Sequence, residues 1–440
     1  GVSHLDDARQ APPNRQHFDG WSMGPNLDSP FKPGEHIPGL NVGGFYDAGD
    51  FDIQTRSQFS TIQNLALAYR EFGLKWDELT VDWKARSVEM HRPDGTPDTL
   101  EHIKHGVLQV LAQIKAVGHT FPVVEEPYLR EYTHLGDGAS KTDGRIYSDR
   151  LGPHEVEGAY SGIPDDRWAF TTKSAGMQYG SAATLAAAAQ ALRGYDDAMA
   201  KECLDTAVKI WDDEHANPTP ARQGGGFPGM AAADEWSAAL QLLIATNGAE
   251  PYKKRVAELF PTVSQRFFGF FGWTAVRALP YMDAAFKKQL EETVKTYVAQ
   301  TDKELAATPF GVPPSRGGWG GSAQVIDLGV RMYFLHKAFP ELVGKDYTLR
   351  AANYILGTHP VSSTSYVSAV GTRSKLRAYG NNRADNSFIA GGVIPGYVVI
   401  KPDFPECIDD FGFLWFENEY IITVASKWIL AANAADALVR

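Results

Sequence analysis

Apolar side chains that recur every three or four residues most constrain how this chain can fold. In one such segment Phe59, Ile62 and Leu65 fall on one side, which is the pattern of an amphipathic helix. Gly73 follows as a typical helix end. The same reasoning predicts further helices at 97–118, 180–195, 197–214, 231–247, 251–259, 281–301, 322–339, 346–356 and 418–438. The last is apolar on nearly every side, so we expect it to be buried all round.

Long loops rich in glycine, proline and aromatic residues separate these helices, at 10–50, 119–173, 216–230, 306–321 and 357–416. Strand signals are few, and the clearest is at 396–402. About ten or more helices with almost no strand predict an all-α fold, an (α/α)6 barrel whose loops form a substrate cleft at one mouth. A superhelical array is the alternative, but no repeat period of 30–45 residues is visible. We therefore expect one catalytic domain over residues 1–440.

The charge of the chain limits its partners. Its 440 residues carry a formal net charge of −11. An acidic chain is a poor match for nucleic acid or for an anionic membrane, because phosphate groups call for clustered Lys and Arg. No apolar run approaches the ~20 residues of a membrane span. The two cysteines, Cys203 and Cys407, leave their pairing and the redox compartment open.

The stretch "GGFYDAGDF" at 43–51 places two carboxylates, Asp47 and Asp50, three residues apart before the first strong helix. One interpretation is a capped turn, since Asp and Gly favour turns and Asp caps helices. A second is a cation site, because carboxylate oxygens bind hard ions. The third is a catalytic carboxylate with a partner that helps to hold a water, as in glycosidases.

A glycosidase also needs an acid, and "WFENEY" near the C-terminus offers Glu417 and Glu419. Glu417 suits an acidic first turn that complements the helix dipole. We expect Glu419 to be partly buried beside aromatic residues, which would raise its pKa and suit a general acid. In an α/α barrel the last hairpin meets the first, so Asp50 and Glu419 would lie at the same mouth if both helices are inner ones.

These motifs resemble glycoside hydrolase family 9, a family of inverting β-glycanases with many cellulases. "GGFYDAGDF" is similar to the family's "GGWYDAGD", and "ENEYIITVASKWILAA" to its C-terminal "NE" motif. The stretches "PDTLEHIKHGVLQVL", "THLGDGASKTDGRIY", "DEWSAALQLLIATNGAEPY", "GGWGGSAQV" and "NYILGTHPVSSTSYVSAVGT" resemble family segments in the same order. The resemblance spans from about residue 4 to the end of the chain.

The resemblance implies roles for individual residues. Asp50 matches the general base that activates water, Asp47 the aspartate that positions the water, and Glu419 the general acid. Inversion needs acid and base about 6.5–9.5 Å apart. Residues expected to bind substrate are Tyr46, His134, Trp319, Asn381, Asn382, Arg383 and Trp415. Other tryptophans in loops or near loop ends are candidates for stacking on sugars, namely Trp21, Trp168 and Trp236.

The sequence departs from the family where "YGNNR" stands in place of "HHR". Arg383 matches the arginine, while Asn381 and Asn382 replace the two histidines. Asparagines can still hydrogen-bond hydroxyl groups but do not titrate or stack as histidines do. The expected substrate is therefore a β-1,4-glucan, xyloglucan or mixed-linkage β-glucan, with decorated or mixed-linkage glucans favoured over plain cellulose. Two alternatives stay open: an inactive glycan-binding relative, and an exo-acting β-glucosidase or glucosaminidase of the same family.

No cofactor is expected to be required, and we assign no metal site. A structural calcium stays possible, although 174–184 stands where the family has its acidic ligand stretch and contains no acidic residue. His102 and His105 have a spacing that can bind metal but are more typical of polar residues on a helix face.

The first residues resemble a segment that lies inside the family's catalytic domain. We therefore expect that a first helix and an immunoglobulin-like β-sandwich precede it, and that the protein is secreted, periplasmic or on the surface of a bacterium. Another α/α-barrel enzyme acting on uronates is disfavoured, because no basic cluster lies near the motifs.

Overall fold

The computed structural model forms two compact units, residues 1–225 and 226–440, and each is described by itself. The residues it describes are 5–17, 20–48, 52–126, 132–134, 137–140, 142–220, 230–308, 310–315, 320–359, 363–376, 378, 388–397 and 415–440. For 132–134, 137–140 and 415 the description covers the backbone alone.

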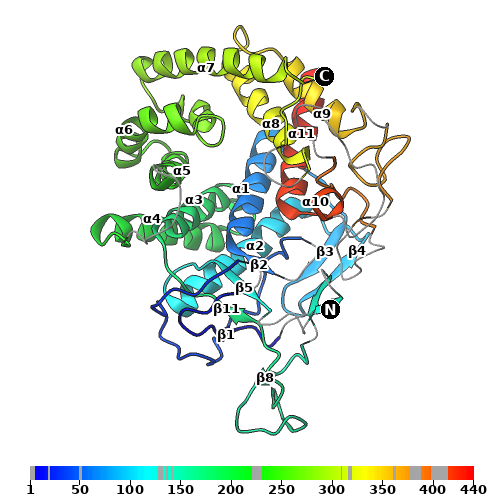
Figure 1. Cartoon of the computed structure of the whole chain (residues 1–440). Helices are drawn as coiled ribbons and strands as arrows, with labels where there is room; N and C mark the ends of the chain where they lie inside the picture. Colours follow the sequence, from blue (N-terminus) through cyan, green and yellow to red (C-terminus); the bar gives the residue numbers. More distant parts are fainter. Residues whose placement is uncertain are drawn as a thin grey trace. The chain divides into compact units, whose positions relative to one another are not determined.

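Four helices make up most of the first unit (Figure 1): α1 (Thr55–Phe72), α2 (Asp98–Val117), α3 (Ala175–Leu192) and α4 (Asp197–Ala216). Helix α1 packs against α2 and α3, and α3 packs against α4. Gly73 and Gly118 end α1 and α2 in the left-handed region, at φ 60° and 86°. A residue without Cβ adopts this conformation at little cost, so both helices stop where the sequence predicted.

Small side chains let α1 and α3 approach closely. Nearly every alanine of α3 is buried, so this helix has core on most of its sides. A Cβ placed on Gly180 would lie 2.7 Å from Cε2 of Phe59, a distance that real Cβ atoms essentially never show. The contact between the two helices therefore requires glycine at this position.

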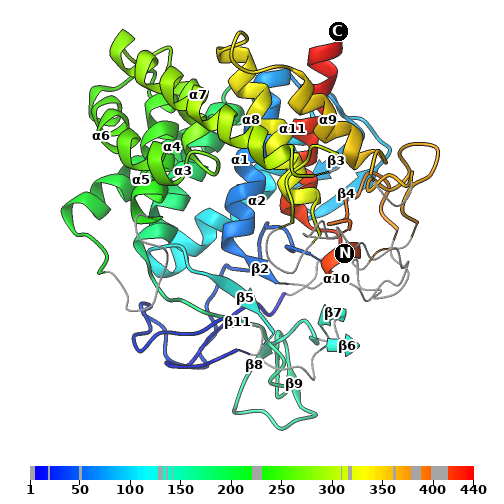
Figure 2. The same cartoon turned by 45° about the horizontal axis from the view of Figure 1, so that its top comes forward.

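A small sheet connects the segments around these helices (Figure 2). Its strand order is β1 (Arg9–Gln10), β11 (Trp168–Ala169), β5 (Val123–Glu125) and β2 (Ile53–Gln54). β1 and β11 are parallel, whereas the other two pairs are antiparallel. β2 comes directly after the Asp47–Asp50 motif and leads into α1. The sheet therefore determines where the motif enters the first helix.

The remaining strands of the first unit are β3 (Leu79–Asp82), β4 (Ser87–Met90), β6 (Tyr132–His134), β7 (Asp137–Ser140), β8 (Ile146–Tyr147), β9 (Val156–Glu157) and β10 (Tyr160–Ser161). Of these, β6 to β10 lie in the loop predicted at 119–173, whereas β3 and β4 lie between α1 and α2, where no strand was predicted. β3 and β4 pair as a hairpin, and so do β6 and β7. β8 and β9 flank β10 in an excursion that extends away from the β1–β11–β5–β2 sheet (Figure 1). All are short, which agrees with the prediction of little strand.

The second unit is helical: α5 (Met230–Ala245), α6 (Glu250–Arg266), the 3-10 helix η2 (Gly272–Ala278), α7 (Ala284–Leu305), α8 (Ser322–Ala338), α9 (Asp346–Ile355), α10 (Trp415–Asn418) and α11 (Ile422–Val439). α5 packs against α6, and α8 packs against α9 and α11. Rings of Trp236, Phe260 and Phe286 join α5, α6 and α7, with centroids 5.8 and 4.9 Å apart. Trp236 is fully buried, so its prediction as a sugar-stacking residue is wrong.

All ten helices expected from the sequence are present, with differences at their ends. α6 continues to Arg266 and contains Pro261, beyond the expected end at 259. The helix expected at 418–438 begins only at Ile422. η2 and α10 were not predicted. Of the strand expected at 396–402, residues 396–397 are not in a strand, and 398–402 lie outside the described residues.

The last helix differs from its prediction in burial. Only Val424, Ser426, Leu430, Ala431 and Ala434 of α11 are buried. Val439 is 65% exposed, so the helix is not buried all round. By length and composition alone α11 could cross a membrane, a test that core helices of water-soluble proteins also pass. The expectation of no membrane span therefore stays a prediction.

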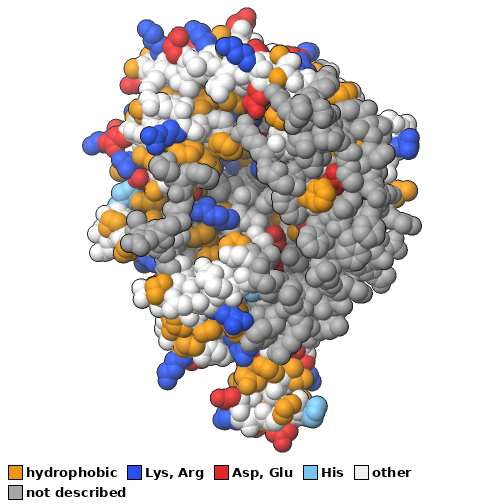
Figure 3. Space-filling model, in the orientation of Figure 1, with side chains coloured by type: hydrophobic (Ala, Val, Ile, Leu, Met, Phe, Trp, Pro, Cys, Tyr) orange, Lys and Arg blue, Asp and Glu red, His pale blue; other side chains and the backbone are white. Residues whose placement is uncertain are grey.

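Figure 3 shows one face of the molecule with side chains coloured by type. On this face the described Lys and Arg side chains are scattered and mixed with Asp and Glu rather than gathered into one basic patch. Such mixing is typical of a solvated surface. Among the described side chains of this face there is therefore no basic patch of the kind that nucleic-acid binding requires.

Candidate active site

The motif loop of the first unit lies against helix α2. Gly43 and Gly44 have φ of +62° and +81°. The Gly44 N–H donates to the carbonyl oxygen of His105 (3.0 Å), and His105 Nε2 lies 2.7 Å from the Gly44 oxygen. A Cβ on Gly43 would lie 2.3 Å from the His105 oxygen, so no other residue fits here without a shift of backbone. The positive φ of both glycines lets the loop bend against α2.

Helix α1 holds the next residue of the loop. The Phe45 N–H donates to Gln58 Oε1, and Gln58 Nε2 donates back to the Phe45 oxygen, both at 2.7 Å. Gln58 is fully buried, so these bonds are protected from competition with water. Sequence reasoning missed Gln58 and His105 as residues that support the motif. The sequence offered one signal for Gln58, a polar amide next to Phe59 on the apolar side of a predicted helix.

Asp47 is 9% exposed, and its N–H donates to the carbonyl oxygen of Asp52 (3.1 Å). Asp50 lies outside the described residues. The N-cap of α1 is Gln54, which makes no side-chain capping bond. Helix capping therefore does not explain Asp47.

Tyr46 lies between the core and a buried ion pair. Its ring packs against a cluster that includes Ile53 and Val124. The guanidinium carbon of Arg167 lies 5.7 Å from the Tyr46 ring centroid, and Arg167 Nε donates to Asp7 Oδ1 at 2.8 Å. Burial lowers the pKa of Arg167, but the facing Asp7 carboxylate outweighs it and raises that pKa. A permanent positive charge therefore lies under the Tyr46 ring.

Glu419, in the second unit, lies between α10 and α11 and is 6% exposed. The Gly396 N–H donates to the oxygen of Glu417 (2.9 Å). The neighbouring Tyr420 hydroxyl lies 2.7 Å from Ser368 Oγ and accepts from the Ile389 N–H (3.2 Å). Glu419 is thus buried as expected, and hydrogen bonds hold the backbone of Glu417 before it and the side chain of Tyr420 after it. Because α11 starts at Ile422, neither Glu417 nor Glu419 is in its first turn.

The loop that holds Glu417 is ordered by aromatic packing. The rings of His359 and Tyr366 stack with centroids 4.7 Å apart, and Tyr397 meets both edge-on. His359 Nε2 also lies 2.8 Å from the Thr364 oxygen. The stretch "NYILGTHP" therefore acts as a structural support for the C-terminal motif.

Most residues expected to bind substrate cannot be placed. Trp319, Asn381, Asn382 and Arg383 lie outside the described residues, as do the side chains of His134 and Trp415. Trp168 is 7% exposed, with the Arg15 guanidinium carbon 4.6 Å from its ring centroid. It is a core residue of the sheet, and its prediction as a stacking residue is wrong.

The segment expected to replace the family's calcium ligands does not fit a metal. Ser174 Oγ caps α3 by accepting from the Met177 N–H (3.4 Å), and Gln178 Nε2 donates to the Thr120 oxygen (3.1 Å). The segment 174–184 offers no carboxylate. No step of a reaction is therefore assigned to a calcium ion there.

The other metal candidates are also weak. Cys203 is buried in α4, and burial raises the pKa of its thiol to about 12, whereas zinc binds the thiolate. Cys407 lies outside the described residues. His102 Nδ1 lies 2.8 Å from the Asp98 oxygen, and His105 is bonded to Gly44. These histidines support the backbone, in agreement with the structural interpretation.

The sequence profile of glycosyl hydrolase family 9 matches residues 3–427 of the chain. The chain belongs to glycosyl hydrolase family 9. The match includes both motifs, the aspartates at 47 and 50 and the glutamate at 419. Among curated proteins no match was found.

Solved structures of family 9 share the fold. A family 9 glycoside hydrolase of Bacteroides ovatus has a TM-score of 0.67 at 19% identity, over 99% of this chain and 77% of that chain. A mutant thermostable endoglucanase from Alicyclobacillus acidocaldarius has 0.69 at 17%, over 94% and 79%. A cellulase of C. cellulolyticum has 0.63 at 16%, over 90% and 88%. The predicted all-α fold of the (α/α)6 barrel class is confirmed.

Proposed function

We propose that the protein hydrolyses a β-linked glucan by an inverting general acid–base mechanism. Membership of family 9 supports a glycoside hydrolase of β-glucan. The observation that carries the proposal is that Asp47 and Glu419, each in a family motif, are both buried. Similar structures include one described with cellobiose and one with a cellobiose-like isofagomine.

Each carboxylate has a role in this mechanism. Asp50 acts as general base and removes a proton from the attacking water, while Asp47 accepts a hydrogen bond from that water and orients it. Glu419, protonated, donates its proton to the leaving glycosidic oxygen. Water attacks the anomeric carbon from the face opposite the leaving group, so the configuration inverts. These steps need no cofactor, because both protons move through side chains.

The substrate we propose is a β-1,4-glucan, xyloglucan or mixed-linkage glucan, with plain cellulose the least favoured. Asn381 and Asn382 in place of two histidines support this choice, since amides bond hydroxyl groups but present no ring to a sugar. We further propose that the enzyme acts outside the bacterial cytoplasm, because polymeric glucans do not enter cells intact.

Activity on a panel of β-glucans tests the assignment. We expect Asp50→Ala and Glu419→Gln each to lower kcat by about 10³-fold or more, and Asp47→Ala by about 10²-fold or more. Glu417→Gln is the matched control, a buried carboxyl two residues from the acid, and it should retain most of the wild-type kcat. Proton NMR of the first products should show the α-anomer.

Three results would contradict the proposal in different ways. Wild-type rates in both Asp50→Ala and Glu419→Gln would remove the catalytic assignment. A β-anomer as first product would exclude inversion. Binding of glucans without turnover would point to a glycan-binding relative. The mode of cutting is a separate question: release of single sugars from one chain end, seen by chromatography of oligosaccharides, would indicate exo action and leave the proposed mechanism unchanged.

A further inference from the structure

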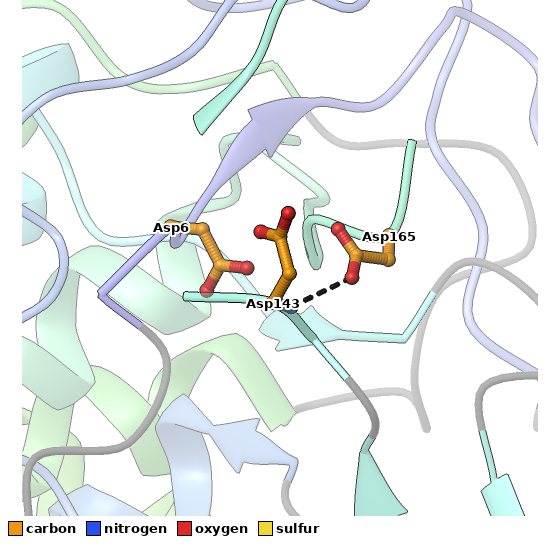
Figure 4. A group of neighbouring side chains, drawn as sticks. All are labelled: Asp6, Asp143 and Asp165. Atoms are coloured by element: carbon orange, nitrogen blue, oxygen red, sulfur yellow. Dashed lines mark hydrogen bonds between the residues drawn. The ribbon is translucent and has the colours of Figure 1, made fainter. Parts of the chain in front are cut away.

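Three aspartates of the first unit come together from distant parts of the chain (Figure 4). Asp6 precedes β1, Asp143 follows β7, and Asp165 precedes β11. One carboxylate oxygen from each lies within 4.8 Å of the other two. Among the described residues, this is the one group of three or more His, Cys, Asp or Glu close enough to share a metal ion. Neither catalytic motif includes any of these residues.

Nearby backbone N–H groups and one hydroxyl group donate hydrogen bonds to these carboxylates. The Asp143 N–H donates to Asp165 Oδ2 (2.7 Å), the Arg145 N–H to Asp143 Oδ1 (2.7 Å), and Thr142 Oγ1 to Asp6 Oδ1 (3.3 Å). The bond from Thr142 occupies Oδ1 of Asp6, and Oδ2 of Asp6 accepts none from the described residues. The Arg145 guanidinium donates to the Asp143 carbonyl oxygen rather than to a carboxylate.

Asp6 is the most deeply buried carboxylate of the group. Its side chain is fully buried, and its Oδ2 accepts no hydrogen bond from the described residues. Figure 4 shows this carboxylate pointing toward Asp143 and Asp165. A buried carboxylate oxygen without a donor costs about 1–3 kcal/mol or more. Such an atom, aimed at two further carboxylates, is the arrangement that a bound cation stabilises.

Size and charge point to calcium. Ca²⁺ takes oxygen ligands at about 2.3–2.6 Å, so two ligands on opposite sides of the ion lie about 4.6–5.2 Å apart. Three oxygens within 4.8 Å of one another can therefore all touch one such ion. Mg²⁺ is smaller, demands near-octahedral geometry and keeps several waters, which a largely buried site does not favour. Three carboxylates around a divalent ion would leave a net charge of −1.

We propose that Asp6, Asp143 and Asp165 bind a calcium ion that ties the β8–β9–β10 excursion to the β1–β11–β5–β2 sheet. The ion would join segments 22 and more than 130 residues apart along the chain. β2 of this sheet follows the catalytic motif in the chain and runs directly into α1. A calcium ion that stabilises the sheet would therefore also stabilise the position of the motif. The site uses none of residues 174–184, and it does not depend on the hydrolytic activity.

Calcium binding to the full chain tests the proposal. Protein treated with EDTA and returned to chelator-free buffer is titrated with CaCl₂ by calorimetry, and its thermal unfolding is measured with and without millimolar Ca²⁺. We expect one site per chain that depends on these aspartates, and a rise of about 2–5 °C in Tm. MgCl₂ at the same ionic strength should give a smaller shift.

Variants locate the site. Asp6→Asn and Asp143→Asn should each weaken calcium binding by about tenfold or more and reduce the Tm shift, because ligand charge sets affinity. Asp149→Asn is the matched control, an exposed aspartate of the same excursion, and it should keep both. Asp143 is only half-buried, so its variant tests the site even if Asp6→Asn does not fold.

The proposal is overturned if wild-type protein shows neither binding nor a Tm shift. It is equally overturned if Asp6→Asn or Asp143→Asn binds calcium as tightly as the wild type, since the ion would then lie elsewhere. A Mg²⁺ shift as large as that of Ca²⁺ would exclude the assignment to calcium.

Discussion

Gly43 and Gly73 have nearly the same backbone conformation, φ 62° and 60°, but very different surroundings. A Cβ at Gly43 would meet the His105 oxygen at 2.3 Å, whereas a Cβ at Gly73 would meet nothing within 4 Å. Substitution of either glycine strains the backbone equally, but only a side chain at Gly43 would also push the motif loop away from α2.

We predict that Gly43→Ala lowers the free energy of unfolding by about 2–4 kcal/mol and also lowers kcat, because the motif loop must move. Gly73→Ala, the matched control, should cost only about 1–2 kcal/mol and leave kcat unchanged. Urea denaturation and assays of both variants make the comparison. Equal losses of stability and activity in the two variants would show that the contact with α2 is unimportant.

Glu101 is a second residue whose environment matters. It is 3% exposed in the first turn of α2, and its Oε2 accepts no hydrogen bond from the described residues. Burial, then Asp94, Asp98 and Asp77, raise the pKa of Glu101 to about 7 from an ordinary 4.5. The folded state therefore holds this proton more tightly than the unfolded state between these two values, so stability falls as pH rises from about 4.5 to 7.

We predict that Glu101→Gln is more stable than the wild type at pH 8 by about 1–3 kcal/mol, and that the difference shrinks toward zero near pH 4.5. Urea unfolding of both proteins across this range measures it. Glu341→Gln, at an exposed position, should show no such pH-dependent difference. A variant less stable than wild type at pH 8 would contradict the prediction.

At the scale of elements, packing between helices overrides local preference. Alanine favours a helix over glycine by about 1 kcal/mol, yet Gly180 in α3 is pressed against Phe59 of α1. We predict that Gly180→Ala destabilises the protein by about 1–3 kcal/mol through overpacking. A double-mutant cycle with Phe59→Leu checks the cause. The smaller leucine side chain should leave room for the new methyl group and recover part of the lost stability. If the two changes in the free energy of unfolding are purely additive, the destabilisation by Gly180→Ala does not come from its contact with Phe59.

Helix α6 shows the same competition at Pro261, where the sequence pattern suggested an end. Proline inside a helix costs about 3 kcal/mol because it removes one backbone bond and crowds the preceding turn. Phe260 and Val263 on either side are fully buried, and Phe260 packs against Trp236 and Phe286. Burial of these side chains offsets the cost, so the helix continues to Arg266. A local rule could not anticipate this.

At the scale of the molecule, helix number and loop length were enough to predict the barrel class, and family 9 membership agrees with it. The two compact units were not expected, and they leave the single-domain prediction untested. The prediction that α11 is buried on all sides was also wrong, because its apolar composition does not say which sides meet other helices.

The sequence by itself determined the helices, the family and the carboxylates at 47, 50 and 419, since periodicity and motifs are local properties of the chain. Only the tertiary structure decided which distant residues support them. Gln58 and His105 hold Phe45 and Gly44, Arg167 lies under Tyr46, and Asp6 meets Asp143 and Asp165. Such pairings depend on how segments far apart in sequence pack together, and the contact energies that select them exist only in the folded chain.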